Sequence, residues 1–298
     1  MYYDISFNPK AIRKLNNKTK LSYKKVGPVL GIDKQHFLEK DNWYLIDGAM
    51  QYFKNRQDSR IIGELLSDEI LRMHGFVPAT YELANLNDNF GLLSPNIHKK
   101  GYRYESVATL HKLFPEFRYT YNHSRNITLK GIIDFIGDNV PNGEELKTQI
   151  IRKYVVDWFT NQLDDNIRNM VFEQNLEGEI HLAKIIDSES SFGATKQGIN
   201  SEMSNIWVPA IPYEDVNFRT GPYKTNDGED INILGLLIDY PEVVIPLLGE
   251  FTDTNYDRVI NKYKKSNTSG IYIPEPGVDF IKSFVESRQE ESHKISTL

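Results

Sequence analysis

Three oxygen-bearing side chains in one short stretch have the types and order needed for metal-assisted phosphoryl transfer. Asn169 lies five positions after Asp164, and Asp187 lies eighteen positions after Asn169. Mg²⁺ prefers carboxylate and carbonyl oxygens, which Asn169 and Asp187 supply. Asp164 is then placed to accept a proton from an incoming hydroxyl. The alternative is that all three are ordinary turn or cap residues, because Asp and Asn are common in loops.

A helix and a hairpin must position these side chains. Apolar residues recur at three- and four-residue steps before Asp164, which predicts an amphipathic helix over 143–163. Residues 170–172 and 180–186 predict two strands around a turn at 175–178. Because an antiparallel hairpin brings its outer ends together, Asn169 and Asp187 are expected to be neighbours.

A second pair of charged residues lies in the N-terminal third. Asp47-Gly48 between two apolar runs predicts a hairpin, and Lys54 ends its second strand. Residues 61–73 have helical spacing, and Glu64 lies in this helix, ten residues after Lys54. A strand lysine paired with a helix glutamate holds ATP phosphates in kinases. Glu69 is the competing helix partner, and a solvated strand-end lysine is the alternative for Lys54.

The catalytic-loop region resembles the HipA-like (CtkA-like) family of protein kinases. The run from Gln162 to Asn169 is similar to the family's Asp-x-Asn-x-x-Asn loop, which follows a helix. Asp187 resembles the family's metal-binding Asp after the hairpin. The chain departs from the pattern at Asp165, where Arg is frequent, and at Asn166, where His is frequent. Ser188-Glu189 also replaces the Phe-Gly of ordinary protein kinases.

The resemblance implies an α+β, two-lobed protein-kinase-like fold. A small β-rich N-lobe is expected over residues 1–96 and a mainly helical C-lobe over 97–298. The hinge that offers backbone groups to adenine is expected at Leu93, Ser94 and Asn96.

The resemblance also assigns roles to the residues above, with ATP and Mg²⁺ as cofactors. Lys54, oriented by Glu64, is expected to hold the phosphates. Asn169 and Asp187 are expected to hold Mg²⁺, and Asp164 is expected to be the catalytic base.

The remaining segments carry weaker signals. The Gly- and Lys-containing run from Leu21 to Gly31 is either a loop that covers phosphates or a surface loop. Residues 192–230 lack a clear period and are either an activation segment with a substrate platform or a long surface excursion. Helices are expected over 231–240, 241–251, 255–264 and 278–288, followed by a frayed tail from residue 290.

Composition excludes several classes of function. The 298 residues contain no cysteine, which excludes disulfides and thiolate chemistry and suits a reducing cytosol. The N-terminus lacks a secretory signal pattern, so a cytoplasmic location is expected, with export without a classical signal as the alternative. No apolar run is long enough to cross a membrane. The net charge of −6, without an obvious basic face, gives no reason to expect a nucleic-acid partner.

The expected function is transfer of the γ-phosphoryl group of ATP to Ser or Thr hydroxyls of a protein substrate. Relatives in the family also imply a regulatory or antitoxin partner. Three alternatives remain open at this stage: a nucleotide-binding pseudokinase scaffold, a lipid or small-molecule kinase, and an α+β interaction protein without a nucleotide site.

Overall fold

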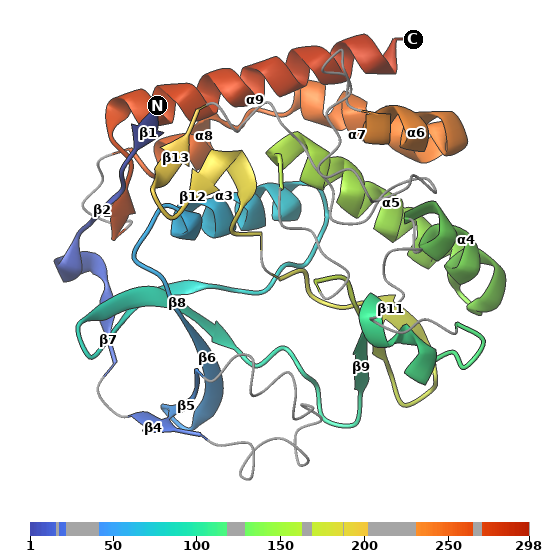
Figure 1. Ribbon diagram of the computed structural model, residues 1–298, viewed down its shortest axis with the longest axis horizontal. Helices are drawn as coiled ribbons and strands as arrows, with labels where there is room; N and C mark the ends of the chain where they lie inside the picture. Colours follow the sequence, from blue (N-terminus) through green and yellow to red (C-terminus); the bar gives the residue numbers. More distant parts are fainter. Residues whose placement is uncertain are drawn as a thin grey trace, which may run out of the picture.

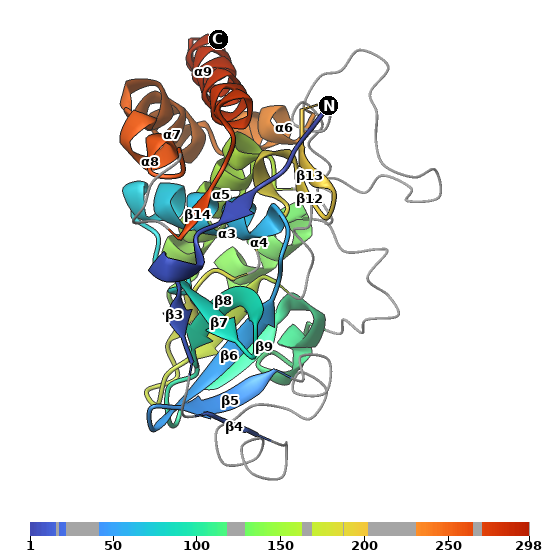
Figure 2. The same ribbon diagram turned by 90° about the vertical axis from the view of Figure 1, so that its left-hand side faces the viewer.

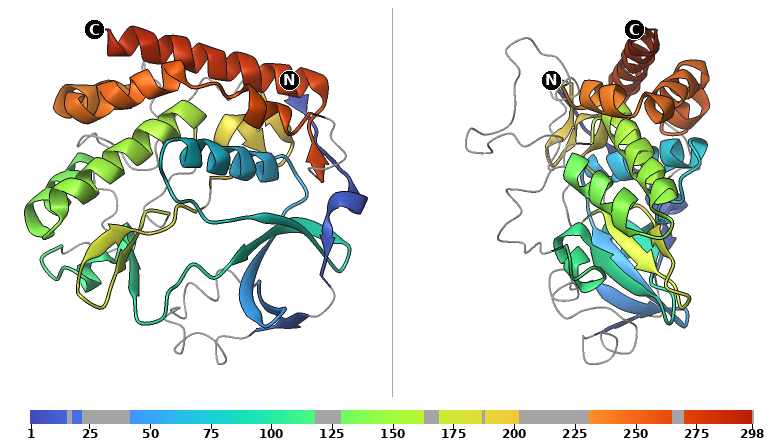
Figure 3. Two further views of the ribbon diagram at one scale, coloured as in Figure 1. Left: turned by 180° about the vertical axis from the view of Figure 1, so that it is seen from behind. Right: turned by 90° about the vertical axis from the view of Figure 1, so that its right-hand side faces the viewer.

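The computed structural model describes residues 1–15, 18–21, 42–117, 129–162, 169–186, 188–201, 231–264 and 270–297. One end of the molecule is a β-sheet and the other is a group of helices, with helix α3 between them (Figure 1). The rear view shows the same three levels (Figure 3). No helix in these ranges is both long and apolar enough to span a bilayer.

The sheet has six strands in the order β3-β7-β8-β6-β5-β4. All neighbours are antiparallel except β3 and β7. The strands are β3 (Arg13–Lys14), β4 (Lys18–Lys20), β5 (Trp43–Ile46), β6 (Ala49–Asn55), β7 (Glu82–Leu86) and β8 (Asn89–Pro95). The hairpin expected at Asp47-Gly48 is present, because Ile46 pairs with Ala49 and both turn residues have positive φ.

Helix α3 (Arg60–Met73) is amphipathic and lies between the sheet and the helices. Ile61, Leu66 and Ile70 on this face are buried. Gly75, at φ +82°, follows the helix end and is the residue type that best tolerates this conformation. The buried α3 residues share one core cluster with the other helices and with Leu92 of β8, while Phe53, Leu93 and other sheet residues form a separate cluster.

Helix α5 (Gly143–Thr160) is at the centre of the helical part. Its aromatic side chains Tyr154, Trp158 and Phe159 are fully buried, and it packs against α4, α7 and α9. The other helices are α4 (Leu129–Asn139), α6 (Ile231–Asp239), α7 (Pro241–Asp253), α8 (Asp257–Asn261) and α9 (Glu275–Ser296). The side view shows α7 and α9 stacked above α3 and α5, with the sheet below (Figure 2).

Short strands join distant parts of the chain. β10 (Val171–Gln174) pairs with β9 (Arg103–Ser106) and β11 (Ile180–Leu182). β13 (Gly198–Asn200) pairs with β1 (Tyr2–Tyr3) and β12 (Ala194–Thr195), and β14 (Ile271–Tyr272) pairs with β2 (Ser6–Phe7). The 3₁₀ turns are η1 (Pro9–Ala11), η2 (Val107–Lys112) and η4 (Ser191–Gly193). The N-terminal strands thus pair with the C-terminal half, and the proposed lobe boundary at residue 96 stays a prediction.

Three expectations about the elements need correction. Helix α5 ends at Thr160 instead of residue 163, because Asn161 adopts a left-handed φ of +54°. The strand expected over 180–186 ends at Leu182. The prediction of a frayed tail from residue 290 was wrong, because α9 continues to Ser296 and its residues Ser292 and Ile295 are buried.

Candidate active site

Lys54 and Glu64 form a buried ion pair. Lys54 lies on β6 and Glu64 one turn into α3, and the two atoms Nζ and Oε2 are 2.7 Å apart. The side chains are 9% and 0% exposed. A buried charge of this kind is stable only when paired, so each residue fixes the other. Glu69 does not compete for Lys54, because its carboxylate binds the Lys262 ammonium and the Tyr263 hydroxyl.

The second oxygen of Glu64 holds the chain that follows the hairpin. The Ser188 backbone N–H donates to Glu64 Oε1 at 3.2 Å. Ser188 directly follows Asp187 in sequence, so Glu64 links Lys54 to the segment that carries the expected metal ligand. Asp187 itself lies outside the described residues.

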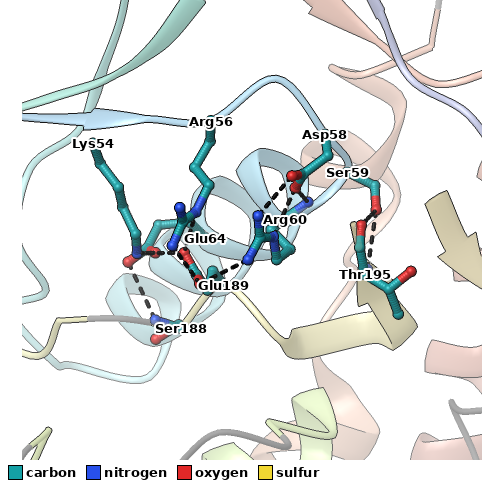
Figure 4. A network of polar contacts seen from close by, with 9 residues as sticks. All are labelled: Lys54, Arg56, Asp58, Ser59, Arg60, Glu64, Ser188, Glu189 and Thr195. Atoms are coloured by element: carbon teal, nitrogen blue, oxygen red, sulfur yellow. Dashed lines mark hydrogen bonds and ion pairs between the residues drawn. The ribbon is translucent and has the colours of Figure 1, made fainter. Parts of the chain in front are cut away.

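Glu189 adds a second carboxylate to Lys54 (Figure 4). Its Oε2 lies 2.7 Å from Lys54 Nζ. Arg56 donates to both oxygens of Glu189 at 3.1 Å, and Arg60 NH1 lies 3.6 Å from Oε1. Lys54, Arg56 and Arg60 therefore surround one buried carboxylate that comes from the segment after the hairpin. Sequence reasoning missed this cluster and noted Glu189 only as a departure from Phe-Gly.

The start of α3 fits closely against the same segment. A Cβ added to Gly63 would lie 2.4 Å from the Glu189 carbonyl oxygen, so only glycine allows this approach. The Ser59 hydroxyl donates to the Thr195 carbonyl and accepts from the Thr195 N–H (Figure 4). Residues 188–195 are therefore attached to α3 by backbone contacts as well as by charge.

The structure describes only part of the expected catalytic loop. Asp164 lies outside the described residues, as do Asp165 and Asn166. Asn169 is half-buried and lies two residues before β10. Asn142, which precedes α5, donates to the Ile180 carbonyl at 2.7 Å and so ties α5 to the hairpin. The proximity of Asn169 to Asp187 stays a prediction.

The expected hinge residues belong to the sheet. Leu93 and Ser94 are buried residues of β8, paired in register with Phe53 and Tyr52 of β6. The Asn96 N–H donates to the Met50 carbonyl at 3.2 Å. In this conformation the amide of Asn96 already has a partner, and adenine contacts at 93–96 stay a prediction.

The residues present fit ATP and Mg²⁺ by chemical type. Lys54 carries an ammonium, a group of the kind that binds phosphate oxygens, and Glu64 holds it at 2.7 Å. Asn169 and Asp187 are oxygen donors of the kind that Mg²⁺ prefers. Within the described ranges no group of three or more His, Asp or Glu residues could hold a metal ion.

A cavity of about 340 Å³ lies elsewhere, between the end of α3, α5 and the β10–β11 hairpin. Its lining includes Lys99, Arg152 and Lys184 but not Lys54. The cavity is therefore not the site built by the Lys54–Glu64 pair.

Asp68, on α3 near this site, has a strongly perturbed carboxyl group. Its pKa is raised to about 9, mainly by burial and then by the negative charge of Glu64, one turn earlier on α3. Arg72, at 3.7 Å, opposes the shift only in part. Asp68 is therefore protonated near neutral pH, which limits the negative charge around the Lys54–Glu64 pair.

The chain matches no family model and no curated protein sequence. Its fold is similar to that of CtkA, a proinflammatory kinase of Helicobacter pylori, with a TM-score of 0.56 and 14% identity over 85% of this chain and 91% of CtkA. It is also similar to HipA of Shewanella oneidensis, solved with HipB and operator DNA, with a TM-score of 0.50 and 10% identity over 82% of this chain and 57% of HipA. The resemblance expected from the sequence is confirmed at the level of the fold: the chain has the α+β fold of the HipA-like (CtkA-like) kinases, with a small β-rich lobe and a mainly helical lobe.

Proposed function

We propose that the chain is an ATP- and Mg²⁺-dependent kinase that transfers the γ-phosphoryl group to Ser or Thr hydroxyls of a protein. The observation that carries the proposal is the buried Lys54–Glu64 pair at 2.7 Å in a fold shared with CtkA and HipA. A buried ion pair is costly to desolvate, and binding of nucleotide phosphates would give this pair a function that accounts for its presence.

Each candidate residue then has one role. Lys54 binds phosphate oxygens, and Glu64 holds the Lys54 ammonium in place. Asp164 orients the substrate hydroxyl and accepts its proton, while Asn169 and Asp187 hold the metal. Mg²⁺, when bound, neutralises charge on the transferred phosphoryl group. Because phosphoryl transfer depends on alignment and electrostatics, Lys54 and the metal ligands should supply most of the acceleration.

The experiment is transfer of labelled phosphate from γ-labelled Mg-ATP to protein, followed by mass-spectrometric mapping of the modified residues. Label on Ser or Thr that is lost in both Asp164→Asn and Asp187→Asn, with unfolding temperatures unchanged, supports the proposal. Label that persists in both variants would exclude this site. Label in an organic extract instead of protein would identify a lipid kinase.

A second candidate is a nucleotide-binding pseudokinase that acts as a scaffold. The contact between Glu189 and Lys54 at 2.7 Å favours the pseudokinase, because the Glu189 carboxylate occupies one side of the ammonium that is expected to bind phosphate. Thermal stabilisation by Mg-ATP without any phosphate transfer would support this candidate over the kinase.

A regulatory protein partner is proposed from the likeness to HipA alone, since that protein was solved with HipB. The test is to purify the chain from its native source under mild conditions and measure its size by gel filtration with light scattering. A mass equal to that of the 298-residue chain alone argues against a stable partner.

A further inference from the structure

Glu189 places a carboxylate on the ammonium that the proposed function assigns to nucleotide phosphates. Its Oε2 lies 2.7 Å from Lys54 Nζ, the same distance as Glu64 Oε2 on that atom. Lys54 and Glu189 are both buried. Among the described residues, Lys54 thus contacts two carboxylates of different origin, one from α3 and one from the segment after the hairpin.

The two carboxylates differ in their other partners. Glu64 is fixed by the Ser188 N–H and by its position in α3. Glu189 instead has two guanidinium groups: Arg56 binds both of its oxygens at 3.1 Å, and Arg60 NH1 lies 3.6 Å away. A two-point contact between Arg and a carboxylate is among the stronger charged hydrogen bonds in proteins. Glu189 therefore keeps charged partners if its contact with Lys54 is lost.

We propose that Glu189 is an internal competitor for the Lys54 ammonium and so sets the affinity of the site for the triphosphate. On binding, Lys54 keeps Glu64 and exchanges Glu189 for a phosphate oxygen, while Glu189 stays with Arg56 and Arg60. The exchange is required because a phosphate and a carboxylate that share one ammonium repel each other in a poorly solvated site. This inference rests on the proposed function.

Two consequences distinguish this role from a purely structural one. Removing the charge of Glu189 should tighten binding of ligands that carry phosphates, whereas loss of a structural contact should weaken all ligands alike. Adenosine has no phosphate, so its affinity should not depend on Glu189.

The experiment is calorimetric titration of the full chain with Mg-ATP and with adenosine. In Glu189→Gln the Kd for Mg-ATP should fall by about tenfold or more, because removing one like charge favours binding even in bulk water and does so more strongly in a poorly solvated site. The Kd for adenosine should stay unchanged. The matched control is Glu179→Gln, which changes an exposed carboxylate at the hairpin turn and should alter neither value.

Arg56 supplies a test in the opposite direction. Arg56→Gln removes the guanidinium that binds Glu189 once Glu189 has left Lys54, so Mg-ATP binding should weaken several-fold. In the Glu189→Gln background the same change should have no effect on Mg-ATP binding. If Arg56 bound the phosphates itself, the loss would appear in both backgrounds and overturn the proposal. The Arg56 side chain is 32% exposed, so Arg56→Gln should fold. If Glu189→Gln does not fold, the effect of Arg56→Gln on Mg-ATP binding still tests the role of Glu189.

The outcomes separate the two proposals. If no form of the chain binds Mg-ATP, the proposed function fails and this inference fails with it. If Mg-ATP binds the wild-type chain, and Glu189→Gln binds it equally or more weakly, the kinase proposal survives and the role of Glu189 is overturned.

Discussion

Ser59 and Thr195 lie 136 positions apart and exchange two hydrogen bonds. The Ser59 hydroxyl donates to the Thr195 carbonyl at 2.8 Å and accepts from the Thr195 N–H at 3.1 Å. Ser59, the residue before α3, thus uses its side chain to satisfy both backbone polar groups of Thr195 in β12. The contact connects the start of the helix that carries Glu64 to the segment that carries Glu189, and α3 and this segment should therefore move together.

The first prediction compares two buried serines of the α3 region, each 1% exposed. Ser59→Ala removes both partners of the Thr195 backbone and should cost about 1–3 kcal/mol of unfolding free energy. Ser67→Ala is the matched control, because the Ser67 hydroxyl has no hydrogen bond in the described part of the chain. It should be neutral or slightly stabilising, since Ala is the better helix former. Urea unfolding measures the free energy of unfolding of both variants. Equal losses would mean that the hydrogen bonds between Ser59 and Thr195 do not stabilise the fold.

The second prediction compares two glycines within helices. Gly63→Ala places a Cβ 2.4 Å from the Glu189 carbonyl oxygen, so α3 or the segment at 189 must shift. We expect a loss of about 1–3 kcal/mol, typical of overpacking, together with weaker nucleotide binding. Gly249→Ala in α7 meets nothing within 4 Å and should gain about 0.5–1 kcal/mol. A stable Gly63→Ala with unchanged binding would show that the close approach is not needed.

Local signals made much of the fold predictable from the sequence. Asp47-Gly48 specified its hairpin because both residues tolerate positive φ. The apolar period of α3 put Glu64 one turn into a helix that follows the strand of Lys54, and the two atoms meet at 2.7 Å. Their use in catalysis stays a prediction, as do the roles of Asp164 and Asp187, which lie outside the described residues.

Contacts between distant segments were not predictable. Glu189 meets Arg56 across 133 positions, and no local pattern marks that pair. The C-terminal helix was missed from residue 290 because its residues read as polar. Burial of Ser292, which donates to the Arg288 carbonyl, depends on α9 packing against the rest of the core.

The third prediction concerns the pH dependence of stability. The folded pKa of Asp68 is raised to about 9 by burial, above its ordinary value of 3.8, so the folded state binds this proton more tightly than the unfolded state. This contribution is complete below pH 3.8 and is lost progressively as the pH rises to about 9. Asp68→Asn stays neutral, so its stability relative to wild type should increase with pH, by at most about 1.4 kcal/mol per unit.

Unfolding temperatures of wild type and Asp68→Asn at pH 5, 6, 7 and 8 would measure this difference. Asp138→Asn, on an exposed part of α4, is the control and should follow the wild type at every pH. A constant difference between Asp68→Asn and wild type over this range would mean that Asp68 is ionised in the folded chain.

The last prediction uses the two glutamates of α3 between which the sequence could not choose. Glu64→Gln removes the charge that holds Lys54 and should lower phosphate transfer by about 10²-fold or more, the order seen when one electrostatic group of a reaction site is lost. Glu69→Gln affects only the contacts with Lys262 and Tyr263, and should stay within about threefold because such partly exposed pairs are weak. Initial rates at saturating Mg-ATP, with unfolding temperatures measured in parallel, separate the effects. Equal losses of rate in both variants would mean that α3 acts through its stability and not through Glu64.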